Sequence, residues 1–345
     1  MLLTIESTCD ETAAAVIDPD GRPIGNCVAT QDELHRRFRG VVPEIAARAH
    51  VQNILPVIET AMTQANIEPS NLTAIAVADR PGLAGSLLVG VVAAKTLAMV
   101  WDKPLVAVNH LHAHLYACQL AAQSETPPRE VYPCVGLVVS GGHTSLYRCD
   151  SPLDLTYLGG TIDDAAGEAF DKVAAMLNLG FPGGPAVSKL AAKGDPAAYA
   201  FPRSMLNKDN HDFSFSGLKT AVRYAIVGRG SSTDPSTIDV DPQTAANLCA
   251  SFESAVVETI VTKCIRAAQQ TGVGDLIVGG GVAANGALRR GLQTAADEAG
   301  LTLTVAPMSL CTDNAVMGAI AWEKIRREEF ADLSLSITPG LQRGF

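Results

Sequence analysis

Three histidines stand within five positions in the segment NHLHAHLYA, residues 109–117. Because successive helical residues turn by about 100°, a helix here places His110 and His114 on one face and turns His112 away. Such a pair can bind a metal ion with the help of further ligands, although ordinary packing explains many pairs at this spacing. The glutamate that HExxH metallopeptidases carry directly after the first histidine is missing, so a peptidase of that type is disfavoured.

A third ligand has to come from elsewhere in the chain. Asp313, in SLCTDNAVMGA, is the best candidate, because we expect it at the N-terminus of the last helix after a strand. Cys311 is a rival candidate in the same segment. Two histidines and one carboxylate with open positions suit iron(II) or zinc acting as a Lewis acid.

Other carboxylates occur in two groups. Glu6, Asp10 and Glu11 lie on the first strand connection. They can serve as a general base, position a water or a metal, or be ordinary exposed turn residues. Further along, Asp164, Glu168 and Asp171 share one face of an expected helix. We expect Asp171 to contact ribose hydroxyls, because glycine-rich loops lie nearby in the sequence.

Glycine-rich loops follow expected strands at three places: Ser140–Gly142, Gly183–Gly184, and Gly279–Gly281 with Asn285. Glycine lets backbone N–H groups approach an anion or a flat ligand, and a helix N-terminus adds a favourable dipole. None of these loops matches the P-loop or the dinucleotide fingerprint. Three such loops in one chain favour an actin–hexokinase type of nucleotide fold, in which two related halves close on a nucleotide.

The order of expected elements supports this fold class. Two segments, beginning at residues 1 and 131, each open with a hairpin and continue with alternating helices and strands. We therefore predict an α/β protein of the actin/hexokinase-like fold, with two related RNase H-like lobes and a central cleft. The first lobe is expected at 1–118 plus 318–345 and the second at 119–317. Residues 121–132 and 228–243 are expected to be linkers or surface loops.

The composition of the chain bears on its cellular compartment and on the partners it can bind. The chain has 345 residues, a formal net charge of −10 and eight cysteines without a CxxC pair. We find no leader and no apolar run long enough to span a bilayer, so we expect a cytoplasmic protein without a membrane. A nucleic-acid partner would need a local basic patch. The candidate residues for such a patch are His35, Arg36, Arg37, Arg39, Arg289 and Arg290. The same residues could also belong to an ordinary solvated surface.

Ten segments, spread in order from about residue 3 to residue 340, together resemble one family. They include IESTCDET, NHLHAHLYA, VSGGHTSL, DDAAGEAFDKVAAML, FSFSGLKTAV, GGGVAANGALR and CTDNAVMGA. The family is the bacterial tRNA N(6)-adenosine threonylcarbamoyltransferases, once labelled O-sialoglycoprotein endopeptidases. The resemblance implies transfer of a threonylcarbamoyl group from threonylcarbamoyl-AMP to the exocyclic amine of adenosine 37, in tRNAs that read codons beginning with A. It also implies two protein partners, an inactive paralogue and a small ATPase.

The resemblance also assigns site residues. His110, His114 and Asp313 match the metal ligands of the family, with one divalent ion per subunit and iron(II) expected ahead of zinc. Asp10 and Glu11 fall on an acidic motif thought to assist the reaction. The residues that match substrate contacts are Val138, Val139, Ser140, Gly141, Gly142, Asp171, Gly184 and Asn285. His112 and Arg80 depart from the usual family pattern.

Two other functions remain open on sequence alone. An ATPase or phosphotransferase of the actin–hexokinase type would share the fold and the loops but would not need His110 or His114. A non-catalytic scaffold subunit of the modification complex typically lacks the histidine pair and Asp313, and this chain has all three.

Overall fold

The computed structural model describes residues 1–38, 40–206 and 208–340. The chain divides into two compact units, which are described separately. Unit 1 comprises residues 1–130, 151–155 and 307–345, and unit 2 comprises 131–150 and 156–306. The predicted division placed the two boundaries at 118/119 and 317/318. The first unit continues past residue 118 because the helix that carries the histidines runs unbroken to Gln123.

Unit 1 is built on a five-stranded mixed sheet with the order β3-β2-β1-β4-β5. β1 pairs antiparallel with β2 and parallel with β4, which pairs parallel with β5. The strands are β1 (Leu2–Glu6), β2 (Thr12–Ile17), β3 (Pro23–Ala29), β4 (Ala74–Arg80) and β5 (Leu105–Asn109). The carboxyl ends of β1, β4 and β5 therefore lie at one edge of the sheet, where ligand sites of parallel sheets commonly form.

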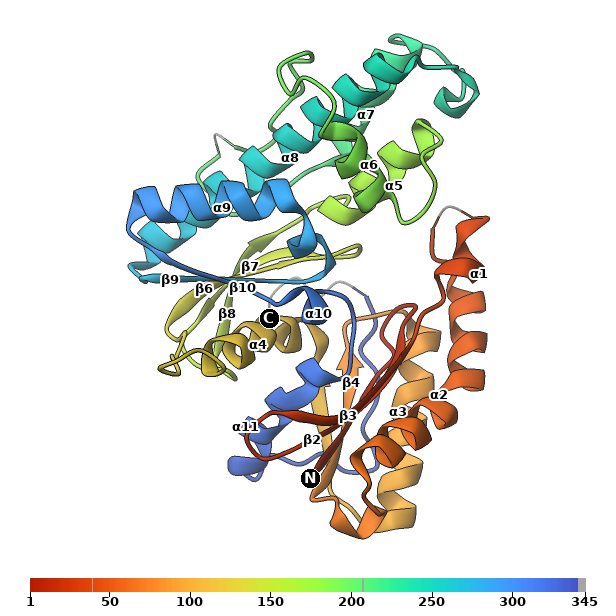
Figure 1. Cartoon of the computed structure of the whole chain (residues 1–345), viewed down its shortest axis with the longest axis vertical. Helices are drawn as coiled ribbons and strands as arrows, with labels where there is room; N and C mark the ends of the chain where they lie inside the picture. The colour runs from red at the N-terminus through yellow and green to blue at the C-terminus, as the bar shows by residue number, and fades with distance from the viewer. Residues whose placement is uncertain (39, 207, 341–345) are drawn as a thin grey trace. The chain divides into compact units, whose positions relative to one another are not determined.

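Helices cover both faces of this sheet. Side chains alternate between the faces along β1, so Leu3 and Ile5 join one hydrophobic core with α2 and α3, while Thr4 contacts η4 on the opposite face. Figure 1 shows α2 and α3 running side by side in orange. The helices of unit 1 are α1 (Asp32–Arg36), α2 (Pro43–Ala65), η1 (Pro69–Asn71), α3 (Ala84–Trp101), α4 (His110–Gln123), α10 (Met308–Cys311), η4 (Val316–Ile320) and α11 (Ala321–Arg326).

Unit 2 repeats the same sheet topology, with the order β10-β9-β6-β7-β8. Its strands are β6 (Cys134–Val139), β7 (Thr144–Cys149), β8 (Leu155–Gly160), β9 (Asp275–Gly279) and β10 (Thr302–Val305). β6 pairs antiparallel with β7 and parallel with β9, as β1 does with β2 and β4. The two sheets confirm the predicted α/β class and its duplicated plan.

The helices of unit 2 include a long one, α8, whose proline lies in the first turn where no intrahelical N–H is needed. Asp241 caps it by accepting from the backbone N–H groups of Gln243 and Thr244. The helices are α5 (Ala166–Met176), α6 (Gly183–Ala191), α7 (Ser216–Val227), η2 (Pro235–Thr237), α8 (Pro242–Thr271), η3 (Gly281–Ala284) and α9 (Gly286–Ala299).

One helix corrects the expectation that no apolar run is long enough to span a bilayer. α3 has 18 residues with a mean hydropathy of 1.7, which by length and composition meets the criterion for a membrane span. A single such helix is weak evidence, because core helices meet the same criterion. Its Leu87, Val91 and Ala94 are buried toward the sheet, whereas Leu88 and Val92 are each 52% exposed.

The last predicted helix begins later than expected. Asp313 was expected at its N-terminus, but helical structure starts at Val316 as η4 and passes directly into α11, and Asp313 lies in the segment between α10 and η4. Asn314 shapes that segment by donating to the carbonyl of Thr312 and accepting from Met317 N–H. Gly318 then packs closely on Thr4, where an added Cβ would lie 3.0 Å from the threonine Cβ.

Candidate functional site

The histidine segment forms a helix directly after a strand, as predicted. β5 ends at Asn109 and α4 begins at His110. The side-chain oxygen of Asn109 accepts a hydrogen bond of 2.9 Å from Leu111 N–H, which satisfies one of the free donors at the helix start. The first turn of α4 is thus fixed at the carboxyl edge of the sheet.

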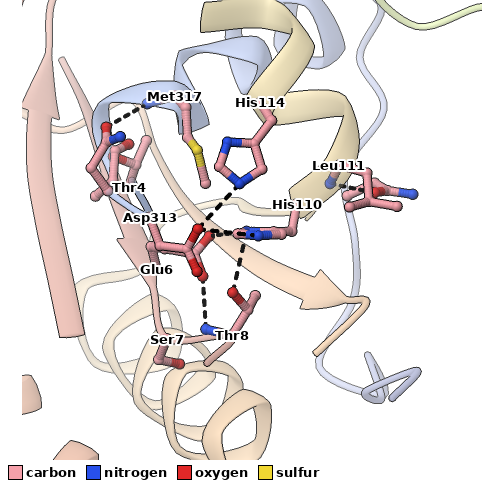
Figure 2. Close-up of polar contacts among 12 residues, drawn as sticks. Thr4, Glu6, Ser7, Thr8, His110, Leu111, His114, Asp313 and Met317 are labelled. Carbon is pink, nitrogen blue, oxygen red and sulfur yellow. Dashed lines mark hydrogen bonds and ion pairs between the residues drawn. The ribbon is translucent and has the colours of Figure 1, made fainter. Parts of the chain in front are cut away.

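His110, His114 and Asp313 come together in unit 1 (Figure 2). Asp313 Oδ1 lies 3.1 Å from His114 Nε2 and 3.5 Å from His110 Nε2. The two rings meet edge to face, with centroids 4.5 Å apart. Both imidazoles are buried, and the three ligand atoms lie within 4.8 Å of one another. Two residues on one helix face and a third from about two hundred positions away therefore share one small site.

His112 stays outside this group, in agreement with the predicted helix geometry. Its side chain is near Lys324 and Arg80 rather than near Asp313. Burial, together with these two positive charges, lowers the pKa of His112 to about 4. His112 is therefore neutral at physiological pH and lies away from the face that carries His110 and His114.

Glu6 and Thr8 contact the far side of the His110 ring. Glu6, at the end of β1, is 3% exposed, and its Oε2 lies 3.1 Å from His110 Nδ1. Its other oxygen accepts from Thr8 N–H at 2.7 Å, and the Thr8 hydroxyl lies 3.2 Å from the same Nδ1 (Figure 2). Because a carboxylate only accepts, this contact places the Nδ1 proton on His110 and directs Nε2 toward Asp313.

The charges of the site favour a bound cation. Burial disfavours the charged form of His110, but the carboxylates of Asp313 and Glu6 outweigh it and raise its pKa to about 9. Burial and the neighbouring His110 lower the pKa of His114. The buried Nδ1 of His114 has no hydrogen-bond partner among the described residues. Two imidazole nitrogens facing one carboxylate oxygen form a donor set that suits a divalent ion.

Cys311, the rival ligand, is not part of this set. It is fully buried, and the described residues contain one group that can hold a metal, formed by His110, His114 and Asp313.

The loop after β1 carries Asp10 and Glu11, which are also half-buried. His50 holds this loop, because its Nε2–H donates to Cys9 O at 2.9 Å and its Nδ1 lies 2.8 Å from the Thr12 hydroxyl. Burial, followed by the charges of Asp313 and Asp10, raises the pKa of Glu11 to about 10. Burial and Asp313 also raise the pKa of Asp10. Both carboxyls are therefore electrostatically coupled to the proposed ligand Asp313.

The SGG loop of unit 2 joins β6 to β7, as predicted. Val138 and Val139 are fully buried strand residues, so they can offer a ligand only backbone groups. The carbonyls of Ser140 and Gly141 accept from the N–H groups of Gly167 and Glu168 at the start of α5. A Cβ on Gly141 or Gly142 would meet no atom within 4 Å, so packing does not require glycine at these two exposed positions.

Asp171 and the FPGGP glycines meet in the same unit. Asp171 Oδ1 accepts from Gly183 N–H at 2.8 Å, at the first residue of α6. An added Cβ on Gly183 would lie 2.6 Å from Asp171 Cα, whereas Gly184 has open space. The expected loop is thus the N-terminal turn of a helix, held against α5 by the carboxylate that was expected to contact ribose.

Asn285 caps α9 and connects it to two other helices. Its Oδ1 accepts from Leu288 N–H at 2.8 Å, and its amide donates to Ser188 Oγ at 2.9 Å and Glu253 Oε1 at 2.8 Å. Beside this network lies a cavity of about 640 Å³ between α6, α8 and α9. Ser188, Glu253 and Arg290 contribute polar groups to its lining. A volume of this size can accommodate a nucleoside-sized ligand.

Gly280 shows why the GGG run is needed at the end of β9. Its φ is +99°, and an added Cβ would lie 2.4 Å from the carbonyl oxygen of Val139. The backbone of this loop therefore packs directly on the end of β6, which places two of the predicted glycine loops next to each other.

Several residues of the candidate basic patch are buried or already bonded within the protein. His35 is fully buried and lies within hydrogen-bond distance of Gln31 and Val42 N–H. Arg36 forms an ion pair with Glu33, and Arg289 donates to the carbonyls of Ala283 and Ala306. Arg39 lies outside the described residues.

Sequence reasoning missed the residues that hold the site in place. His50 and Thr8 are examples, because neither stands in a pattern that predicts chemistry. Glu6 was noted only as one of three loop acids, although its position at the end of β1 on the face opposite Leu3 and Ile5 was a usable signal.

With this geometry in place, comparisons with known proteins are informative. The chain matches the family model described as tRNA N6-adenosine threonylcarbamoyltransferase over residues 23–320. It is 65% identical to the tRNA N6-adenosine threonylcarbamoyltransferase of Rhodopirellula baltica, over 100% of this chain and 98% of that protein. It is 49% identical to the Anaeromyxobacter dehalogenans protein of the same name, over 93% and 92% of the two chains.

Solved structures confirm the fold class at much lower identity. T. kodakarensis HypF matches with a TM-score of 0.60 at 15% identity, over 95% of this chain and 48% of that one. The activator of the 2-hydroxyisocaproyl-CoA dehydratase from Clostridium difficile matches with a TM-score of 0.53 at 10% identity, over 95% and 96%. These proteins share the actin-like ATPase fold. The sequence matches go further, and they show that this chain belongs to the tRNA N6-adenosine threonylcarbamoyltransferase family.

Proposed function

We propose that the chain transfers the threonylcarbamoyl group from threonylcarbamoyl-AMP to the N6 amine of adenosine 37, in tRNAs that read codons beginning with A. The observation that carries this proposal is the buried group of His110, His114 and Asp313, found in a chain that is 65% identical over its whole length to a named transferase. A purely structural paralogue would have no need to keep two buried imidazoles facing a carboxylate.

We propose that His110 Nε2, His114 Nε2 and Asp313 hold one divalent ion, iron(II) ahead of zinc. A bound ion would supply Lewis acidity, which would stabilise negative charge on the developing oxyanion. The donor set supports this assignment, since nitrogen and carboxylate ligands suit both metals.

In unit 2, we propose that the backbone orients the adenylate. The SGG loop offers exposed glycines with open space around them, and Asn285 links α9 to the cavity of about 640 Å³. Gly184 lies in the first turn of α6, where N–H groups and the helix dipole favour a polar ligand edge, and Asp171 on α5 contacts the same turn through Gly183 N–H. These groups position the donor, so little covalent chemistry is required of the chain.

The proposed step balances without a further reactant. The adenosine N6 attacks the donor carbonyl carbon, a C–N bond forms, and the C–O bond to the phosphate breaks so that AMP leaves. Asp10 accepts the proton that the amine loses, because Glu11, with its pKa raised to about 10, already carries a proton near neutral pH and is the poorer acceptor of the two. Both carboxyls lie on the loop that His50 holds, which gives the acceptor a fixed position.

We also propose that the inactive paralogue and the small ATPase act with this chain. Exposed apolar side chains on α2 and α3 support a protein partner on that face, including Val51, Leu55, Leu88, Val92, Met99 and Val100. Exposed apolar side chains gathered on neighbouring helices commonly mark a protein interface.

The test is transfer of labelled threonine onto unmodified tRNA, with the donor adenylate supplied and the partners added or withheld. We expect Asp313→Ala to lose bound metal and to reduce transfer on the order of a hundredfold or more, because one of three ligands is removed. Asp297→Ala, on the exposed surface of α9, serves as the control. Retention of both metal and transfer in Asp313→Ala would show the metal assignment to be wrong. Phosphate release from ATP without labelled tRNA would instead favour a phosphotransferase.

A further inference from the structure

We infer that Glu6 is a positioning residue for His110, which holds the ring so that Nε2 is presented as a ligand atom. This inference rests on the proposed metal site and adds a residue that does not touch the ion. Glu6 would act only through the imidazole, from the end of a different element.

The position of Glu6 follows from the alternation of β1. Leu3 and Ile5 point to the core shared with α2 and α3, so Thr4 and Glu6 point to the opposite face. Thr4 donates to Ala315 O on that face, and Glu6 reaches His110 at the start of α4. A carboxylate that is 3% exposed at this point needs partners, because an unpaired buried charge is costly.

Each oxygen of Glu6 has its own donor. Oε1 accepts from Thr8 N–H at 2.7 Å, and Oε2 accepts from His110 Nδ1–H at 3.1 Å. The short loop contact fixes the carboxylate, and the fixed carboxylate then fixes the ring (Figure 2). A ligating imidazole that donates its other N–H to a carboxylate is held in one tautomer and becomes a stronger electron donor.

The two histidines differ in this respect. The Nδ1 of His114 has no hydrogen-bond partner among the residues that the structure describes, although the ring is fully buried. Of the two histidines, His110 is therefore the one whose second ring nitrogen is held by a carboxylate among the described residues. We expect His110 to be the anchored ligand, with its support depending on Glu6.

The experiment measures binding of Zn²⁺ and Co²⁺ by the full chain, in competition with a chelator, together with the thermal unfolding midpoint. Glu6→Gln is nearly isosteric, but its amide offers a single acceptor oxygen to two N–H donors. We expect Glu6→Gln to weaken binding of both ions by about tenfold and Glu6→Ala by about a hundredfold. Asp79→Asn is the matched control, because Asp79 is a carboxylate 1% exposed on the adjacent strand β4 and is paired with Arg80.

The outcomes separate this inference from the proposed function. Weakened binding in the Glu6 variants, with binding kept in Asp79→Asn, supports the positioning role even where all variants lose thermal stability. Binding of wild-type strength by Glu6→Gln, while His110→Ala binds weakly, overturns the inference and leaves the metal site intact. A wild-type chain that binds neither ion overturns the metal site itself, and the inference falls with it.

Discussion

The carboxylates at 164–171 show how one sequence pattern can hide several roles. The spacing predicted that Asp164, Glu168 and Asp171 share a helix face, but α5 begins only at Ala166. Asp164 therefore precedes the helix and lies 2.7 Å from Lys172 Nζ and 2.8 Å from Lys219 Nζ. Asp171 instead holds the start of α6. Periodicity alone could not reveal this, because the contacts with Lys219 on α7 and Gly183 on α6 depend on helices that come later in the chain.

We expect Asp164→Asn to destabilise the protein in a pH-dependent way. Burial disfavours the charged form of Asp164, but hydrogen bonds from Lys172 and Lys219 outweigh it and lower its pKa below the ordinary 3.8. The carboxylate therefore stabilises the fold fully above pH 3.8, and this contribution is lost as the pH falls through the lowered folded-state pKa. The variant should lose about 1 kcal/mol or less at pH 7, since its lysine partners are partly solvent-exposed.

Urea unfolding of the wild type and Asp164→Asn at pH 7 and at successively lower pH measures this difference. The two free energies of unfolding should converge as the pH falls below 3.8. A constant difference across that range would show that the carboxylate charge is not what Asp164 contributes.

At the scale of elements, the helix α4 was predictable and the last helix was not. The 100° turn between helical residues was sufficient to separate His112 from His110 and His114. The last stretch has a helical pattern, yet helical structure begins only at Val316, because Asn314 bonds to its own neighbours Thr312 and Met317. Gly318 packs on Thr4, and Asp313 lies beside α4 in a non-helical segment. The sequence thus identified the residues of the candidate site but not the backbone that brings Asp313 to it.

We expect Asn109→Ala to loosen the start of α4. Its side-chain oxygen caps the helix through Leu111 N–H, and loss of such a cap costs about 1 kcal/mol. Because His110 is the first residue of α4, the change should raise hydrogen exchange in the first turn and weaken binding of Zn²⁺. Asn109→Asp retains an acceptor and should keep both properties close to wild type. Equal exchange in the alanine and aspartate variants would show that the cap does not order this turn.

At the scale of the whole molecule, the duplication was the most predictable feature. Two hairpins followed by alternating helices and strands gave the right class, and the two sheets have corresponding strand orders, β3-β2-β1-β4-β5 and β8-β7-β6-β9-β10. The unit boundaries could not be predicted closely, because the chain returns to unit 1 at residue 307 through an irregular segment. The exposed apolar face of α3 could not be predicted either, because the sequence of an apolar helix has the same pattern whether its outer face is buried or exposed to solvent.

The exposed side of α2 and α3 provides a prediction about assembly. Leu55 is 62% exposed and Val92 is 52% exposed, on two helices that pack side by side. If the paralogue subunit covers this face, Leu55→Glu with Val92→Glu should weaken its binding by at least about tenfold, because the interface would have to bury two unpaired charges. Ile238→Glu in unit 2, at a residue 38% exposed, is the matched control.

Calorimetry with the purified paralogue measures affinity, and sedimentation of this chain alone measures self-association. Because the substituted side chains already face solvent, the double variant should fold as the wild type does and bind added Zn²⁺ as the wild type does. Wild-type affinity in the double variant would place the paralogue elsewhere. A wild-type dimer that the double variant abolishes, with paralogue binding unchanged, would show instead that a second copy of this chain covers the face.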